Sequence, residues 1–324
     1  MIFKALLFLS CIALWANSTV YVATYNVENL FDDVNDPGRD DDWVFSKTWD
    51  KQIYEAKLHN LARVISAMND GKGPDVLGFQ EVENLKVLED LVKLLPNGGD
   101  YRIIHHDSDA SRGIDVALIS RFPVKKYRSH YVYRSIRDIL EVDLDIHGVE
   151  VKVLVNHWKS RYGGALQSAN TRYFCAARAY QLYMEAIRLN RDAAVILLGD
   201  FNDTPVNLSV SEVLNAKTSK GKVLAQHKRH YLFNLVGDLE NRLVDGPNGT
   251  YYYGGDRNWS YLDQIMVSKA CLTEEGIEFV DGSTEVFVKS FMMQDGEPLG
   301  FDRKTKQGFA DHLPLVAKFR VNRP

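Results

Sequence analysis

The sequence predicts an α+β fold in which two mixed β-sheets pack face to face and helices cover their outer surfaces, a four-layer α/β sandwich. Apolar runs of strand length are interleaved with segments whose apolar residues recur at helical spacing. Two strands, at 140–146 and 149–155, are joined only by His147-Gly148, and so short a connection makes them an antiparallel hairpin. No low-complexity tract, repeat or long Pro/Ser linker interrupts this pattern, which indicates one domain over residues 19–324.

The first half of the chain supplies two helices and four strands. We expect helices at 52–68 and 85–95, because apolar residues recur there every three or four positions along one face. Tyr54, Leu58, Leu61 and Ile65 form that face in the first of them. The strands are expected at 20–25, 76–80, 101–105 and 116–120.

The second half begins with the hairpin, where apolar residues alternate with acids and indicate a half-buried strand at 140–146. A helix is expected at 169–189. The run Ala194 to Leu198 has five apolar residues bounded by glycine, as in a buried strand. Late strands are expected at 262–267 and 315–319.

Composition sets wide bounds on function. The chain has 324 residues, of which 45% are hydrophobic, enough to bury one large core or two modest ones. Its formal net charge of −4 argues against a tight nucleic-acid binder, but not against an enzyme that touches a polyanion locally and releases it.

The N-terminus has the pattern of a secretory signal peptide over residues 1–18. Lys4 precedes the short apolar stretch Ala5 to Leu14, and Ala16-Asn17-Ser18 offers small residues for cleavage after Ser18 or Ala16. A buried first strand and a membrane anchor are the alternatives, but the apolar run is too short to span a bilayer. We therefore expect a secreted or periplasmic protein.

Cysteine usage leaves one question open. Cys11 lies in the expected signal, so Cys175 and Cys271 remain. They could form a disulfide in an oxidising compartment or be two buried thiols, and the second reading is favoured slightly. The chain has no Cys-x-x-Cys, which argues against a zinc ribbon or a thiol redox centre.

Polar residues follow three of the expected buried strands. Gln80-Glu81 follows the strand at 76, Asn156-His157 follows the strand of the hairpin, and Asp200 to Asp203 follows the strand at 194. In open α/β sheets the carboxyl ends of strands face the ligand crevice. Carboxylates, amides and histidines gathered on one rim are typical of a metal-assisted phosphate-ester site, where hard oxygen ligands hold the metal and other groups move protons.

A set of short segments makes this interpretation specific. In order and spacing they resemble the endonuclease/exonuclease/phosphatase superfamily, which includes deoxyribonuclease I, exonuclease III and bacterial sphingomyelinases. The secreted bacterial branch is the most similar, and the resemblance covers nearly all of the mature chain. The segments that carry it are 24–31 (Thr-Tyr-Asn-Val-Glu-Asn-Leu-Phe), 78–82 (Gly-Phe-Gln-Glu-Val), 112–118 (Arg-Gly-Ile-Asp-Val-Ala-Leu), 156–161 (Asn-His-Trp-Lys-Ser-Arg), 199–203 (Gly-Asp-Phe-Asn-Asp), 262–265 with Ser268, and 311–314 (Asp-His-Leu-Pro).

The resemblance implies a role for each site residue. The family binds its divalent metal, Mg²⁺ with Mn²⁺ or Ca²⁺ as alternatives, at positions matched here by Asn26, Glu28, Glu81 and Asp311. Glu81 would be the principal ligand. Three further groups complete the implied catalytic set. Asp200 and Asn202 would orient the attacking water and the phosphate, Asp263 and His312 would form the Asp–His pair, and His157 would contact the phosphate or donate a proton.

Other polar residues have more than one interpretation. Arg112, Arg161 and Arg172 are candidate phosphate ligands, because arginine binds phosphate bidentately. Arg161 is favoured because it belongs to the same segment as His157. For Arg172 a role on the helix surface is at least as well supported. Asp203 is read as an N-cap before Thr204-Pro205. Asp115 could hydrogen-bond a site residue or end a turn.

Two segments have both a binding and a structural interpretation. The acidic loop formed by Asp32, Asp33, Asp36, Asp40, Asp41 and Asp42 could bind calcium, but it fails the EF-hand pattern, and a solvated loop is favoured. Tyr251-Tyr252-Tyr253 and Trp259 could stack on bases or a sugar, although packing is the favoured reading.

The function predicted from these residues is that of a secreted, magnesium-dependent phosphodiesterase, an endonuclease on DNA with RNA as a further substrate. A phosphatase or a sphingomyelin-type lipid phosphodiesterase of the same fold is the alternative, and a non-catalytic binding module is the rival from another class. We expect nucleic acid as substrate, no stable protein partner, no membrane span and a monomer. Motifs of serine hydrolases, P-loop nucleotide triphosphatases and zincins are absent from the sequence.

Overall fold

The computed structural model describes residues 18–36, 49–227, 229–240 and 246–322. Within them two seven-stranded sheets pack face to face. The first sheet has the order β14-β18-β1-β2-β4-β3, with β15 also paired to β18. Its strands are β1 (Ser18–Leu30), β2 (Val76–Val82), β3 (Arg102–His105), β4 (Asp115–Ser120), β14 (Gly276–Phe279), β15 (Glu285–Val286) and β18 (Leu315–Asn322).

The second sheet has the order β5-β6-β7-β8-β13-β10-β9. Its strands are β5 (Val124–His130), β6 (Ile139–Ile146), β7 (Val149–His157), β8 (Ala194–Asp200), β9 (Ala216–Lys217), β10 (Leu232–Asn234) and β13 (Asp263–Val267). Two small hairpins lie apart from the main sheets: β11 (Tyr251–Tyr253) with β12 (Asn258–Ser260), and β16 (Met293–Gln294) with β17 (Glu297–Pro298).

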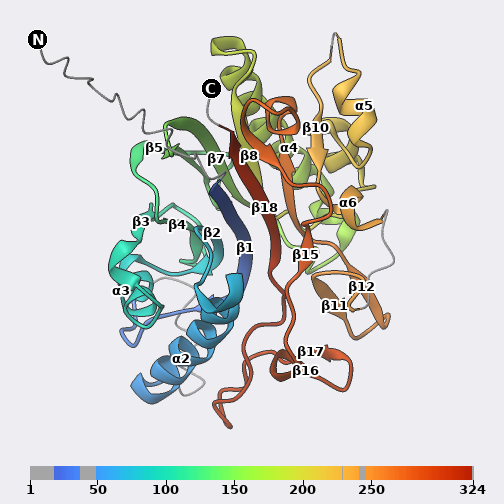
Figure 1. Cartoon of the computed structure of the whole chain (residues 1–324). Helices are drawn as coiled ribbons and strands as arrows, with labels where there is room; N and C mark the ends of the chain where they lie inside the picture. The colour runs from blue at the N-terminus through green and yellow to red at the C-terminus, as the bar shows by residue number, and fades with distance from the viewer. Residues whose placement is uncertain (1–17, 37–48, 228, 241–245, 323–324) are drawn as a thin grey trace, which may run out of the picture.

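Helices cover the two outer faces. Figure 1 shows α2 and α3 beside β2 to β4 on one side of the molecule, and α4 and α5 on the side of β8 and β10. The helices are α2 (Lys51–Ala67), α3 (Leu85–Lys93), α4 (Ala165–Leu189), α5 (Lys220–Leu224) and α6 (Val236–Glu240). Short turns of helix lie at Asn69–Gly71, Gly98–Asp100, Ser209–Val213, Lys269–Leu272 and Ser290–Met292. The predicted four-layer sandwich is confirmed.

Strand alternation divides the apolar residues into two clusters. Val153 and Val155 of β7 face the first sheet, whereas Leu154 faces α4. The same alternation in β8 sends Ile196 and Leu198 between the sheets, and Val195 and Leu197 toward α4. A strand buried on both faces reads as a continuous apolar run, which is why 194–198 is so clear in the sequence.

Local sequence explains where the elements begin and turn. The Asp50 side chain accepts a hydrogen bond from Ile53 N at 2.9 Å and begins α2, and Asn84 accepts one from Val87 N at 3.1 Å and begins α3. His147 and Gly148 both have positive φ, as a two-residue hairpin turn requires. The predicted hairpin is thereby confirmed.

Several elements escaped prediction. The edge strand β5 was missed because most of its side chains are exposed and it carries Lys125, Lys126 and Arg128. The predicted signal peptide, apart from Ser18, lies outside the described residues. Ser18 pairs with Val321 at the start of β1. No helix among the described residues is long and apolar enough to cross a membrane.

Gly199 allows β7 and β8 to approach beside the strand ends. Its φ is 141°, and a Cβ atom there would lie 1.9 Å from the carbonyl oxygen of Asn156. We predict that Gly199→Ala lowers the free energy of unfolding by about 3 kcal/mol, because the strained backbone and the clash add together. Urea unfolding measures the change. Gly221→Ala, where a Cβ meets nothing within 4 Å, is the matched control, and equal unfolding midpoints for the two variants would contradict the prediction.

Candidate active site

Strand register brings the predicted site residues to one rim. β1 and β2 run parallel with Asn26 opposite Gln80, which places Glu28 and Glu81 at neighbouring strand ends. In the second sheet β7 and β8 run parallel with His157 opposite Asp200. β13 is antiparallel to β8, so Asp263 at its start lies opposite Asp200 at the end of β8. Asp311 and His312 lie just before β18, the other neighbour of β1.

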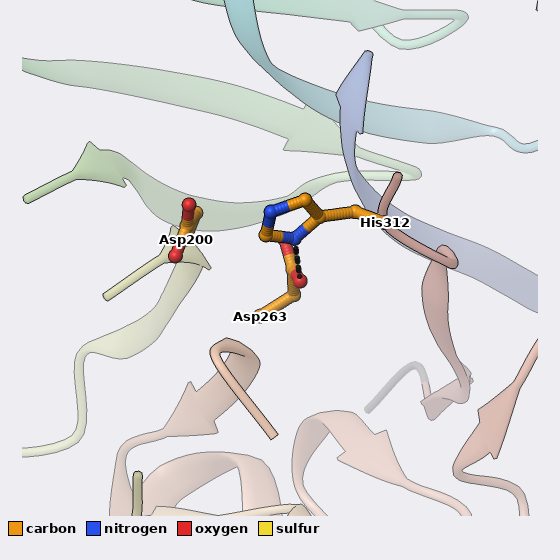
Figure 2. Close-up of side chains that lie close together, drawn as sticks. All are labelled: Asp200, Asp263 and His312. Atoms are coloured by element: carbon orange, nitrogen blue, oxygen red, sulfur yellow. Dashed lines mark hydrogen bonds and ion pairs between the residues drawn. The ribbon is translucent and has the colours of Figure 1, made fainter. Parts of the chain in front are cut away.

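The centre of this rim is a buried group of two carboxylates and an imidazole. Asp200, Asp263 and His312 each offer an atom within 4.8 Å of the others, a spacing that could also hold a metal ion. His312 Nδ1 and Asp263 Oδ2 are 2.7 Å apart. Figure 2 shows the Asp200 carboxylate on the other side of the ring from Asp263. The predicted Asp–His pair is therefore present as a hydrogen-bonded unit, with the second ring nitrogen toward Asp200.

The two site histidines have opposite protonation tendencies. Burial by itself lowers the pKa of His312, but Asp263, Asp311 and Asp200 raise that pKa well above its usual value. Burial also lowers the pKa of His157, and there the nearby cations Arg137, His312 and Arg112 lower it further. These opposite shifts favour the imidazolium form of His312 and the neutral form of His157, and a pair of groups with pKa values moved apart is typical of acid–base sites.

Asp200 is held by amide groups on both sides. Its Oδ2 accepts hydrogen bonds from Asn26 Nδ2 and Asn202 Nδ2, both at 3.1 Å, and its Oδ1 accepts one from Asn202 N at 2.8 Å. His157 Nε2 lies 3.6 Å from Asp200 Oδ2 and 3.8 Å from Glu81 Oε1. Burial raises the pKa of Asp200 to about 6, against the lowering effect of His312.

A second carboxylate group lies on the β1 and β2 side of the rim. Burial raises the pKa of Glu28 to about 7, and although Lys57 opposes this, Asp311 and Glu81 add to it. A Cβ at Gly300 would lie 3.4 Å from Glu28 Oε2 and 3.8 Å from the Cβ of Asp311, so these side chains meet at that glycine. Glu81 accepts a hydrogen bond from Asn29 N at 2.9 Å. Three acids crowded in this way form an oxygen-rich site suited to a divalent cation.

Lys57 is the cation built into this group, and sequence reasoning missed it. Its side chain is 2% exposed, its Nζ donates a hydrogen bond to the Glu28 carbonyl oxygen, and it lies 5.0 Å from the centre of the Phe301 ring. Burial lowers the pKa of Lys57, whereas Glu28, Asp311 and Glu81 raise it. A signal was available, because Lys57 lies in the i+4 row between Ile53 and Leu61 on the apolar face of α2.

The backbone is strained where it delivers these side chains. Glu28, Asn29, Glu81 and Asn202 all have positive φ, between 49° and 68°, although none is glycine. Non-glycine residues adopt this conformation uncommonly, and it persists where surrounding contacts enforce it. The hydrogen bond from Glu28 N to Asn26 Oδ1, at 3.0 Å, is one such contact.

The structure corrects the interpretation of Asp203 and Arg172. Asp203 does not cap the following turn, because Thr204 N donates instead to Asn207 Oδ1 at 2.7 Å. The Asp203 carboxylate lies 2.8 Å from both Arg161 Nη2 and Arg172 Nε. Arg172 is neither on the surface nor free to bind phosphate, since its side chain is buried in this ion pair.

The same ion pairs position a catalytic candidate. Arg161 Nε donates to the carbonyl oxygen of Asn202 at 2.8 Å, beside the strained backbone of that residue. We call Arg161, Asp203 and Arg172 the Asp203 clasp. It ties the end of β7 to the loop after β8 and to α4. Arg161 as a phosphate ligand stays a prediction, with its guanidinium already engaged by Asp203 and Asn207.

Two other arginines lie near Glu81. Arg112 Nη2 donates to Asn29 Oδ1, next to Glu81. Arg137, which no sequence motif marked, donates from Nε to the carbonyl oxygen of Ile114 at 3.0 Å, and its charge acts on Glu81 and Asp200. Within the described residues Arg137 forms no ion pair, so its guanidinium has unused donors beside the carboxylates.

Asp115, the aromatic segment and the two cysteines, which the sequence left with two interpretations each, make the following contacts. Asp115 accepts hydrogen bonds from the backbone and side chain of Ser108, which closes the loop that carries Arg112. Tyr252 packs on Trp259 with ring centroids 5.3 Å apart, and the Tyr251 ring lies 4.7 Å from that of His312. Cys175 and Cys271 are free and buried, as the favoured reading held.

The acidic loop is only partly described. Asp40, Asp41 and Asp42 lie outside the described residues. Asp32 departs from the solvated reading, because it is buried and its carboxylate accepts hydrogen bonds from Val34 N at 2.6 Å and Asn84 Nδ2 at 3.1 Å. Asp33 lies 3.4 Å from Lys86 Nζ at the surface.

Most of this chain matches a known protein family. A model described as the Endonuclease/Exonuclease/phosphatase family matches residues 21–320. No curated protein matches the chain significantly in sequence. The fold is similar to TDP2 from C. elegans, with a TM-score of 0.58 and 16% identity over 94% of this chain and 75% of that one. It is also similar to a mannosyl-6-phosphatase from Bacteroides thetaiotaomicron, with a TM-score of 0.55 and 16% identity over 93% and 99%.

A third similar structure carries a ligand. It is TDP2 from D. rerio in complex with a single-strand DNA product, with a TM-score of 0.55 and 14% identity over 93% of this chain and 99% of that one. At sequence identities this low, the similarity shows a shared fold and nothing more specific.

The Asp203 clasp predicts strong energetic coupling. Arg172→Met leaves a buried carboxylate short of one partner, so we expect the free energy of unfolding to fall by about 3 kcal/mol. Asp203→Asn removes the charge from the other side. The double variant is expected to lose at least about 1 kcal/mol less than the two single losses added together. Urea unfolding of all four proteins completes the cycle, and strictly additive losses would show that the pair is not coupled.

Proposed function

Because the chain belongs to the endonuclease/exonuclease/phosphatase family, whose members are metal-dependent phosphoesterases, we propose that it hydrolyses phosphodiester bonds of DNA, with RNA as a further substrate. The observation that carries the proposal is the Asp263–His312 pair, which holds a charged imidazole beside Asp200. Such a group can supply both positive charge and a proton to a phosphate ester as it reacts.

The donor set supports a divalent cation, with magnesium the proposed one. Glu28, Glu81 and Asp311 offer hard oxygen atoms, and Asn26 lies beside them. Burial, with repulsion from Asp311 and Glu81, raises the pKa of Glu28, and a bound cation would offset both effects by stabilising the ionised carboxylate. Asp200, Asp263 and His312 form the other candidate cluster, but there the Asp263 carboxylate is already engaged by the imidazole. When bound, the ion supplies Lewis-acid stabilisation of charge on the phosphate oxygens.

The remaining catalytic roles fall to side chains of this site. The Asp200 carboxylate, fixed by Asn26 and Asn202, can orient a water molecule for attack on phosphorus. His312 holds a proton on the ring, and Asp263 keeps the ring in one orientation. His157 stays neutral and presents Nε2 to Asp200 and Glu81. Arg112 and Arg137 are placed to attract a phosphate near Glu81.

DNA is the proposed substrate for two reasons. A similarly folded TDP2 was solved with a single-strand DNA product, which supports a polynucleotide in a rim of this architecture. The net charge of −4 suits local contact with the scissile phosphate rather than a broad electrostatic grip. The secretory pattern of residues 1–18 extends the proposal to action on extracellular or periplasmic DNA, by a chain that functions as a monomer.

Metal binding should change the pH dependence of stability. Without metal, the raised pKa values of Glu28 and Asp200 mean that the folded protein keeps protons that the unfolded chain has lost. Stability therefore falls as pH rises from about 4 to 7. The raised pKa of His312 acts in the same direction, because its contribution is complete below about 6.5 and is lost as pH rises through the folded value.

We predict that magnesium stabilises the protein more at pH 8 than at pH 5, since the ion binds the ionised carboxylates. At one hundred times the dissociation constant the gain is about 2.7 kcal/mol. Thermal unfolding with and without the ion measures it. Glu81→Gln should abolish the gain, whereas Asp33→Asn, at the surface, should keep it. An equal shift at both pH values would count against the assigned ligands.

Nuclease activity has a direct assay. The mature protein is incubated with supercoiled plasmid in magnesium, and the expected result is nicking that a chelator abolishes. His312→Ala should lose at least about 100-fold in rate, because it removes the charged imidazole. His59→Ala, an exposed histidine of α2, is the matched control and should retain activity. Wild-type protein that leaves both plasmid and RNA intact refutes the nuclease proposal, and a sugar phosphate and a micellar choline lipid would then be tried.

A further inference from the structure

An exposed row of apolar side chains runs along the N-terminal half of α4. Leu166, Asn170 and Phe174 follow one another at i+4 spacing, so they lie on one face of the helix. Leu166 is 87% exposed and Phe174 is 54% exposed, and Tyr162, just before the helix, is 93% exposed. Large apolar side chains this exposed and this close together indicate an interaction surface.

The far end of the row is a stacked pair of rings. The rings of Phe174 and Tyr133, a residue between β5 and β6, have centroids 5.6 Å apart and planes within 7° of parallel. Tyr133 is also about half exposed. The half-exposed pair adds aromatic surface to the row, and aromatic rings are the groups on which nucleic-acid bases stack.

The surface around the row is cationic although the whole chain is acidic. No Asp or Glu occurs between Trp158 and Met184, a segment that contains Lys159, Arg161, Arg172 and Arg178. Arg161 and Arg172 share the single carboxylate of Asp203, which balances only one of their two charges. Lys159 and Arg134 are exposed, and in the described part of the chain neither forms an ion pair. A local excess of positive charge remains to attract a polyanion.

The row also adjoins the active-site rim. Lys159 and Tyr162 follow His157 along the chain, and Arg161, between them, donates to the carbonyl oxygen of Asn202. From Leu166 to Phe174 the helix rises about 12 Å. A strand with one phosphate at the rim could therefore lie along the row for a few nucleotides.

We propose that Tyr162, Leu166, Phe174 and Tyr133, here named the α4 row, bind single-stranded nucleic acid leading to or from the active site. Bases stack on Tyr162 and on the Tyr133–Phe174 pair, and phosphates lie beside Lys159 and Arg134. Asn170 in the middle of the row favours this ligand over a lipid bilayer, which would have to desolvate its amide. The inference rests on the proposed nuclease function and adds where its substrate is held.

Binding is measured without cleavage, by fluorescence anisotropy of a labelled single-stranded oligonucleotide in the presence of a chelator. Tyr162→Ala and Phe174→Ala should each raise the dissociation constant about five-fold, the lower end of what one stacked base contributes. Lys159→Gln should reduce the slope of log affinity against log salt by about 0.7. Leu189→Ala, 90% exposed at the other end of α4, is the matched control and should bind like wild type.

Two further measurements separate the explanations. Hydrolysis of thymidine 5′-(p-nitrophenyl phosphate), which reaches only the rim, should be unchanged in the row variants. Tight binding of phosphatidylglycerol vesicles that the same variants weaken, with no oligonucleotide binding, overturns the proposal in favour of a membrane surface. Unchanged oligonucleotide affinity in Tyr162→Ala and Phe174→Ala also overturns it. Wild type that binds the oligonucleotide but never cleaves it contradicts the nuclease proposal and leaves the row standing.

Discussion

The structure depends on holding five carboxylates together at the end of two packed sheets. Glu28, Glu81, Asp200, Asp263 and Asp311 come from separate elements and meet at one rim. Buried like charges repel and are desolvated, which is why the pKa values of Glu28, Asp200 and Asp311 are raised. Cations of the site oppose this repulsion: Lys57 bonds to the Glu28 carbonyl oxygen, the His312 ring bonds to Asp263, and Arg137 acts on Glu81 and Asp200. A divalent cation would complete the compensation, and this links the fold to its chemistry.

Much of the surrounding architecture serves to keep those groups in place. The strained backbone at Glu28, Glu81 and Asn202 is held by hydrogen bonds and by the packed sheets. On the β8 side, the Asp203 clasp anchors the loop that carries Asn202 to α4. On the β1 side, Phe301 N donates to Glu28 Oε2 at 3.1 Å while its ring lies against Lys57. Contacts from elements that are distant in the sequence thus hold the same few side chains in place, as pre-organised catalysis requires.

The sequence predicts the fold class and the longer helices and strands, because burial on one or both faces of an element leaves a clear pattern of apolar residues. Short elements between Asp203 and Tyr251, such as β9, β10, α5 and α6, span only two to five residues and leave none. The same limit applies to single residues. Asp203 and Arg172 are 31 positions apart in the sequence, and no spacing rule connects a helix interior to a loop after a strand. Arg137 has no motif at all, and the fold alone brings it to the rim. Lys57 could have been found, as a charge in an apolar helical row.

The central claim is that the site separates its two histidines into a charged and a neutral one. NMR titration of the imidazole nitrogens, assigned with His157→Gln and His312→Gln variants, tests this most directly. The account predicts that His312 is still protonated at pH 7 and loses its proton only at a pH well above about 6.5, the usual value for histidine, while His157 stays neutral down to a pH well below that value. Two histidines that titrate together near that value, or a charged His157 beside a neutral His312, would contradict the account.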